Sequence, residues 1–141
     1  MENEELKELI NEADNGNEDS QIRLMFYPFL TKEEYENPEK FYKQISEQNK
    51  LKQYHFGKLF KIKREIDKAI YCFKKSDDEN SFLNKIDLGD IYYKQYIQGG
   101  SIEKKEKAIN WYNKALKLAQ TTPFGTLKDN IKSKLKFLQN N

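Results

Sequence analysis

The sequence predicts an all-α protein, an α-solenoid of helix-turn-helix repeats with a capping helix at each end. The main observation is a nine-residue pattern that occurs twice, because KAIYCFKKS at residues 68–76 returns as KAINWYNKA at residues 107–115. An apolar stretch that contains a glycine precedes each copy, around Gly57 and around Gly89. Stacked helix pairs bury one continuous core, so a repeated pair predicts an extended array with a large surface for partners.

The apolar periodicity of the chain and the places where it is interrupted predict the individual helices. Prolines and glycines are scarce, three and six in number, and several lie between the periodic segments. Gly16 and Gly99 suit the left-handed residue that ends many helices. The predicted helices, with no strand between them, lie at about residues 3–14, 19–29, 38–48, 50–62, 65–75, 79–96, 102–120 and 125–138.

Short polar residues before several of these helices are typical of N-terminal caps. We expect Asp19 and Ser20 to open the second helix, and Asn37 followed by Pro38 to open the third. The carboxylates of residues 77–79 are expected to cap the start of the sixth helix and to interact with its dipole.

The helix predicted at 79–96 carries apolar residues over much more of its surface than the roughly 100° stripe of a helix that faces one core. It is therefore expected to have neighbours on both sides, as an internal helix of a solenoid does. Gly89 lies inside it at a cost of about 1 kcal/mol relative to alanine, which a closely approaching second helix would explain. We predict that Ala69 and Ala108 supply the small surfaces that approach the two glycines.

Charge is unevenly distributed along the chain, although the net charge is only +2. Residues 1–50 carry six basic and thirteen acidic side chains, a net charge of −7, whereas residues 51–141 have a net charge of +9. This asymmetry favours a charged partner or head-to-tail association of two copies, although it also serves solubility alone. The sequence also predicts a cytoplasmic protein. No stretch is apolar enough for a membrane span, and the acidic start is unlike a secretory signal. The single cysteine forms no internal disulfide, so an oxidising compartment is not indicated.

The repeated segments resemble the Sel-one-like repeats, which are relatives of the tetratricopeptide repeats. In that family Leu-Gly and a following aromatic residue lie on the first helix, a loop often contains glycine, and the second helix has the form KAxxWYxxA. This chain matches the pattern with Leu88, Gly89, Tyr92, Gly99, Gly100 and residues 107–115.

The resemblance extends over about residues 20–119. The unit before the best match has Phe56, Gly57, Phe60 and residues 68–76, and a degenerate first unit has Met25 for the glycine and Pro38 for the alanine. The resemblance implies one right-handed α-solenoid domain, residues 1–141, of about three helix-turn-helix repeats. The repeats lie at about 20–48, 50–76 and 80–119, with caps at 3–14 and 125–138. Proteins of this class are mostly adaptors and regulators of protein complexes, and in bacteria similar short chains occur beside toxins and secretion systems.

Neither a catalytic residue nor a metal or cofactor site is predicted, so we expect a non-enzymatic protein. His55 and Cys72 are single residues of their types on different helices, whereas metal sites need several converging ligands and catalytic pairs need close contact. We expect Cys72 to be a small buried residue and His55 to lie partly exposed on a helix face. Two carboxylate pairs are interpreted as solvated faces: Glu33 with Glu34, and Asp87 with Asp90.

The expected function is binding of another protein through the solenoid surface. In stacked helix pairs the first helices line the concave side, and tyrosines flanked by charged residues suit interface anchoring. The predicted partner-binding residues are Tyr54, Lys58, Lys61, Asp87, Asp90, Tyr93 and Lys94.

Two other functions and one assembly state stay open. A bacterial immunity protein that neutralises a cognate toxin is compatible with the small size and the charge asymmetry. The second open function is nucleic-acid binding through the basic second half, because residues 52–64 interleave cations with aromatic side chains. Two of these aromatic residues, Phe56 and Phe60, are however predicted to belong to the repeat core. No membrane partner is expected, and a homodimer is possible on charge grounds.

Overall fold

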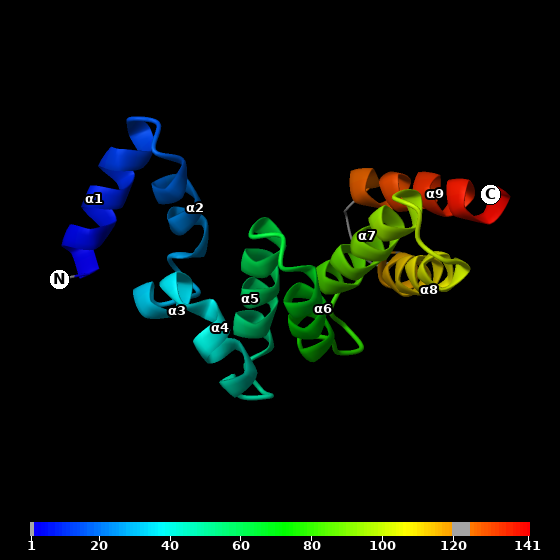
Figure 1. Cartoon of the computed structure of the whole chain (residues 1–141), viewed down its shortest axis with the longest axis horizontal. Coiled ribbons are helices and arrows are strands. Elements are labelled where there is room, and N and C mark those ends of the chain that lie inside the picture. Colours follow the sequence, from blue (N-terminus) through cyan, green and yellow to red (C-terminus); the bar gives the residue numbers. More distant parts are fainter. Residues whose placement is uncertain (1, 120–124) are drawn as a thin grey trace.

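The structure, a computed structural model, describes residues 2–119 and 125–141, which form helices and connecting turns without a strand. The helices follow one another along the long axis of an elongated molecule, and the two termini lie at opposite ends (Figure 1). The all-α class predicted from the sequence is confirmed for these residues. The elements are α1 (Glu2–Asp14), α2 (Glu18–Phe26), α3 (Lys32–Glu36), α4 (Pro38–Phe41), the 3-10 helix η1 (Tyr42–Gln44), α5 (Lys50–Ile62), α6 (Ile66–Lys75), α7 (Leu83–Ile97), α8 (Ile102–Ala119) and α9 (Gly125–Asn140).

The segment between α2 and α5 differs most from the prediction. A short helix, α3, begins at a capping box in which Thr31 Oγ1 accepts the Glu34 N–H and Glu34 Oε1 accepts the Thr31 N–H. Pro38 ends it, because the residue before a proline avoids helical backbone angles. The single helix predicted at 38–48 is therefore wrong, and α4 and η1 replace it.

Two predicted caps are also corrected. Asn17, and not Asp19 or Ser20, caps α2, since its side chain accepts the Ser20 N–H at 2.9 Å. The sixth predicted helix begins at Leu83 instead of 79, and no side chain caps it. Asp77 instead accepts hydrogen bonds from Lys85 Nζ at 2.7 Å and from Asn84 Nδ2 at 2.8 Å, which tie the preceding loop to the first turn of α7.

Three helices end in the same left-handed turn. Gly16, Arg64 and Gly99 have φ angles of 92°, 64° and 99°. In each turn the residue after the left-handed one donates its backbone N–H to a carbonyl five residues earlier in the chain. These carbonyls belong to Glu12, Phe60 and Gln95 respectively. The left-handed ends predicted at the two glycines are confirmed. Arg64 adopts the same conformation with a Cβ, at a cost of about 1 kcal/mol.

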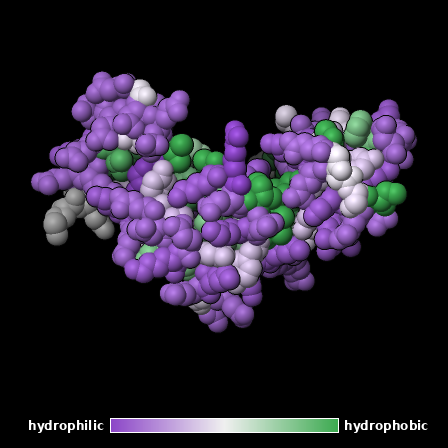
Figure 2. Space-filling model, viewed as in Figure 1, coloured by the Kyte–Doolittle hydropathy of each residue, from purple (hydrophilic) through white to green (hydrophobic). Residues whose placement is uncertain are grey.

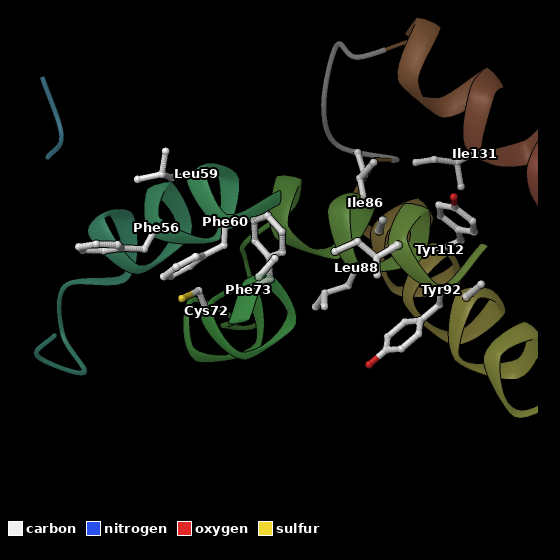
Figure 3. Packing of buried hydrophobic residues seen from close by; sticks show 14 of the residues in the cluster. Phe56, Leu59, Phe60, Cys72, Phe73, Ile86, Leu88, Tyr92, Tyr112 and Ile131 are labelled. Carbon is white, nitrogen blue, oxygen red and sulfur yellow. The ribbon is translucent and has the colours of Figure 1, made fainter. Parts of the chain in front are cut away.

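The hairpins α5–α6 and α7–α8 share one packing contact. A Cβ added to Gly57 would lie 2.7 Å from ring carbons of Phe73, and one added to Gly89 would lie 2.6 Å from ring carbons of Tyr112. Phe73 and Tyr112 are fully buried and occupy the same position of the repeated pattern (Figure 3). The nearest neighbours of the glycines are thus these rings and not Ala69 and Ala108, because a flat ring can lie directly on a bare helix backbone.

One cluster of buried side chains runs from α2 to α9. Figure 3 shows its residues from α5 to α9. Cys72 belongs to it, with 1% of its surface exposed, as the sequence predicts, and burial raises the pKa of its thiol to about 12. Trp111, its counterpart in the second copy of the pattern, is only half-buried. Within the described residues, no helix is long and apolar enough to cross a bilayer.

We expect Cys72 to be almost inert in the native protein. At pH 8 the thiolate fraction is small because the pKa is high, and the core blocks access to the sulfur. Reaction with a disulfide reagent should be at least about 100-fold slower than for the same chain in urea. Fast labelling of the native protein would contradict the packing of α6 against α5.

Candidate functional site

A hollow in the described surface lies between the end of α5, the turn after it, α7 and α9, and is called here the α7 groove. Its volume is about 900 Å³. Hydrophobic surface is visible in this hollow between α5 and the C-terminal helices (Figure 2). The apolar residues that line it are Ile62, Ile66, Ile91, Tyr93 and Ile97.

Two of these isoleucines are unusually accessible. Ile62 is 41% exposed and Ile97 is 51% exposed, whereas Ile91, which also lines the groove, is buried. Both exposed residues lie in the last turn of a helix, beyond the stripe that packs on the core. Exposed apolar side chains gathered beside polar ones mark interaction sites more often than scattered single residues do.

Cations predominate among the charged residues that line the α7 groove. Lys61 pairs with Asp87 at 3.1 Å and Lys134 pairs with Asp90 at 2.8 Å. Arg64 and Lys94 form no ion pair within the described part of the chain and are exposed. The hollow therefore combines an apolar floor with two cationic groups whose charge is not balanced by a neighbouring carboxylate.

Asp90 lines the α7 groove but is already engaged. It accepts a hydrogen bond from the Tyr112 hydroxyl and another from Lys134 Nζ, so it joins α7 to α8 and α9. Burial, followed by the hydrogen bond to Asp90, raises the pKa of Tyr112. Gln95 Oε1, also in the lining, is buried without a hydrogen-bond partner among the described residues.

Of the seven predicted partner-binding residues, the structure brings four to the α7 groove: Lys61, Asp90, Tyr93 and Lys94. The other three form, with Lys61, a neighbouring group called here the Asp87 cluster. The Asp87 carboxylate accepts a 2.9 Å hydrogen bond from the Tyr54 hydroxyl and lies 3.6 Å from Lys58 Nζ.

The interpretation of Asp87 as part of a solvated face is wrong. Asp87 is only 6% exposed, because it lies where α7 packs against α5 and its carboxylate is surrounded by donors from that helix. Burial, and then the negative charge of Asp87, raises the pKa of Tyr54. Asp87 therefore holds two helices together and offers no free carboxylate to a partner. Glu34 is similarly buried, and it accepts hydrogen bonds from Lys52.

The raised pKa values of Tyr54 and Tyr112 predict a loss of stability at alkaline pH. A group whose pKa is higher in the folded state contributes stability that is present below the unfolded value near 10 and is lost as the pH rises above it. Each tyrosine adds at most about 1.4 kcal/mol per pH unit to this decline.

Urea unfolding at pH 8, 10 and 11 measures the decline. We expect Tyr112→Phe to be less stable than the wild type at pH 8 and to lose less stability between pH 10 and 11. Tyr71→Phe is the control, since its hydroxyl has no carboxylate partner in the described residues. Equal declines in Tyr112→Phe and in the wild type would contradict the prediction.

The remaining candidate residues have structural contacts. His55 stacks on Phe29 with 3.6 Å between ring centroids, and burial, then the charge of Lys58, lowers its pKa. Phe56 and Phe60, in the segment considered for nucleic acid, have no exposed surface with which to stack on a base. In the part of the chain that the structure describes, no group of three or more His, Cys, Asp or Glu could hold a metal ion.

Sequence reasoning missed several residues of the α7 groove. Ile62 and Ile97 could have been found on a helical wheel, because each falls at a helix end outside the packed face. The sequence places Lys134 on a predicted capping helix and not in a site. Arg64 has no sequence signal, since nothing in the pattern indicates a left-handed arginine.

No protein-family model matches this chain, and neither a curated protein nor a solved structure is significantly similar to it. The resemblance to Sel-one-like repeats therefore stays a prediction from the repeated pattern.

Proposed function

We propose that this chain is a protein-interaction module, an adaptor or regulator without enzymatic activity, that binds a partner protein in the α7 groove. The observation that carries the proposal is the exposure of Ile62 and Ile97 beside a hollow whose rim is charged. Burying such side chains against a partner is favourable by about 25 cal/mol per Å² of apolar surface. A polar rim around an apolar centre is also the usual anatomy of an interface.

The fold that presents this surface is, in our proposal, a right-handed solenoid of Sel-one-like repeats. Two observations support it. The hairpins α5–α6 and α7–α8 use the same glycine-to-ring contact at the same positions of a repeated sequence pattern. The helices also succeed one another along a single axis (Figure 1). Solenoids of this kind expose extended surfaces and act by binding.

Nucleic-acid binding through residues 52–64 has weaker support. Lys52 pairs with Glu34 at 3.0 Å, and Lys58 and Lys61 both lie beside Asp87, so these cations are partly neutralised. With Phe56 and Phe60 buried, the segment lacks the aromatic platforms that single strands stack on.

Site-specific photo-crosslinking in the cells that produce the protein tests the proposal. A benzoylphenylalanine at position 94 should crosslink to a protein, whereas the same residue at position 110, exposed on α8 outside the groove, should not. Equal products at both positions, or none at 94, would overturn the proposed surface.

Affinity for the captured partner then gives the energetic test. We expect Ile97→Asn to weaken binding by about tenfold or more, as loss of a buried anchor does. Ile102→Asn is the matched control, because Ile102 is 69% exposed and does not line the groove. Equal losses in both variants would show that general destabilisation, and not the groove, is responsible.

A further inference from the structure

We propose that the α7 groove takes an amphipathic helix of the partner protein, with apolar side chains on one face and acidic side chains beside them. This inference rests on the proposed function and names the chemistry of its partner. It follows from the charges that are free at the rim, from the backbone of Arg64, and from the shape of the surface between helices.

The free charges at the rim are positive. Lys61 and Lys134 have carboxylate partners within the protein, and Asp90 is occupied by Lys134 and Tyr112. Arg64 and Lys94 have no such partner among the described residues, so a bound acidic side chain would find two cations without displacing an existing pair. Arginine also matches the two oxygens of a carboxylate with a planar pair of donors.

The backbone of Arg64 supports a role for its side chain in binding. Three helices end in the same left-handed turn, and two of them place glycine at the strained position. At the third, Arg64 has a φ of 64° and lines the α7 groove. Glycine would relieve this strain, so folding does not explain the arginine, and such outliers accumulate at functional positions. The turn holds the start of the arginine side chain at the rim.

A helix suits this surface better than an extended strand. Extended peptides are usually bound at the edge of a sheet, and the described residues contain no strand to extend. A hollow between helices with an apolar floor is instead the usual receptor of a helix that inserts residues at i, i+4 and i+7. Ile62, Ile91 and Ile97 form that floor, and Arg64 and Lys94 lie beside it.

A second copy of this chain is a weaker candidate for the occupant. Its acidic α1 carries Glu5, Glu8 and Glu12 beside the exposed Ile10, but the other apolar residues of that helix, Leu6, Leu9 and Ala13, are already half-buried. They would have to leave their present environment before they could enter the groove of another copy. Self-association is therefore an outcome of the test and not the proposal.

Selection from a peptide library tests the proposal. The probe is a display library of 16-residue helical peptides in which one face and its flanks are randomised, selected on the full chain at physiological ionic strength. We expect enriched peptides to carry apolar residues at i, i+4 and i+7, flanked by Glu or Asp. Their binding should fall about tenfold in Ile97→Asn and stay unchanged in Ile102→Asn.

Arg64→Gly separates binding from folding. Because glycine relieves the left-handed strain, this variant should have a higher melting temperature than the wild type, yet bind the acidic peptides about tenfold more weakly. Lys63→Gln removes an adjacent, exposed charge that does not line the groove, and should leave affinity within about twofold. Full affinity in Arg64→Gly would overturn the acidic assignment.

The outcomes distinguish this inference from the proposed function. Enriched peptides that are neutral or basic, but still sensitive to Ile97→Asn, would overturn the acidic helix and leave the groove as the binding surface. Enriched peptides insensitive to Ile97→Asn would overturn both. Sedimentation that shows self-association, lost in both Arg64→Gly and Glu8→Lys, would assign the groove to a second copy and overturn the partner's helix.

Discussion

Gly89→Ala should lower the free energy of unfolding by about 1–3 kcal/mol, although alanine normally stabilises a helix interior by about 1 kcal/mol relative to glycine. The reason is the Tyr112 ring, which would lie 2.6 Å from the new Cβ. Tyr112 is fully buried and its hydroxyl is bonded to Asp90, so the ring cannot retreat without breaking that bond or opening α7 from α8. Gly89→Leu should be worse, because its larger side chain needs more of the same space.

Urea unfolding followed by circular dichroism measures this effect. Gly125→Ala is the matched control: Gly125 begins α9, and a Cβ there would meet no atom of the described residues within 4 Å, so we expect a change within about 0.5 kcal/mol. Combining Gly89→Ala with Tyr112→Leu should cost less than the sum of the two changes, because the smaller side chain leaves room for the methyl group. A Gly89→Ala protein as stable as the wild type would contradict the glycine-to-ring contact.

The glycine-to-ring contact could be predicted from the sequence only in part. Periodicity and the recurrence of the KAI pattern predict the two hairpins, and a glycine in a helix predicts a close neighbour. The identity of that neighbour depends on the axial offset between two helices. Size alone predicts alanine as the counterpart, but the offset places Phe73 and Tyr112 over the glycines instead.

The structure around α3 differs from the predicted helices for a local reason. The capping box of Thr31 and Glu34 begins a helix of only five residues, and Pro38 ends it before apolar periodicity can be recognised. Short helices of this kind are held by caps and neighbours, here by the pair of Glu34 with Lys52 of α5. A search for periodic segments passes over them, whereas a search for capping boxes would have found this one.

The candidate site was predictable only in part. The sequence pattern places Lys61, Asp90, Tyr93 and Lys94 on the first helices of the repeats, and these four residues line one groove. Burial of Asp87 could not be predicted, since a charged residue is assigned to the surface unless its partners are known. Those partners come from α5, a separate helix, and the left-handed turn of Arg64 is likewise fixed by how α5 meets α6.

Asp87→Ala should lower the free energy of unfolding by about 2 kcal/mol. The change leaves the half-buried Tyr54 hydroxyl without its acceptor and removes the shared partner of Lys58 and Lys61. The two lysines are 37% and 35% exposed, so water replaces much of their attraction and the loss of the Tyr54 hydrogen bond dominates. Urea unfolding in low and high salt should therefore give nearly the same difference.

A double-mutant cycle identifies the interaction responsible. Tyr54→Phe removes the donor and keeps the ring, so its combination with Asp87→Ala should give a coupling energy of about 1 kcal/mol. Lys58→Met in place of Tyr54→Phe is the control, and its coupling should be smaller because its ion pair is longer and more exposed. Equal coupling for the two would mean that charge, and not the hydroxyl, holds α5 to α7.

The same substitution should act in the opposite direction on binding. Lys61 lines the α7 groove while its ammonium group is held by Asp87, so removing that carboxylate frees a third cation at the rim. If the groove takes an acidic helix, the Asp87→Ala protein should bind acidic peptides at least as tightly as the wild type below its melting temperature, despite its lower stability. Weaker binding by the folded variant would mean that Asp87 acts on the partner itself. Stability and affinity would then fall together, instead of separating as the geometry requires.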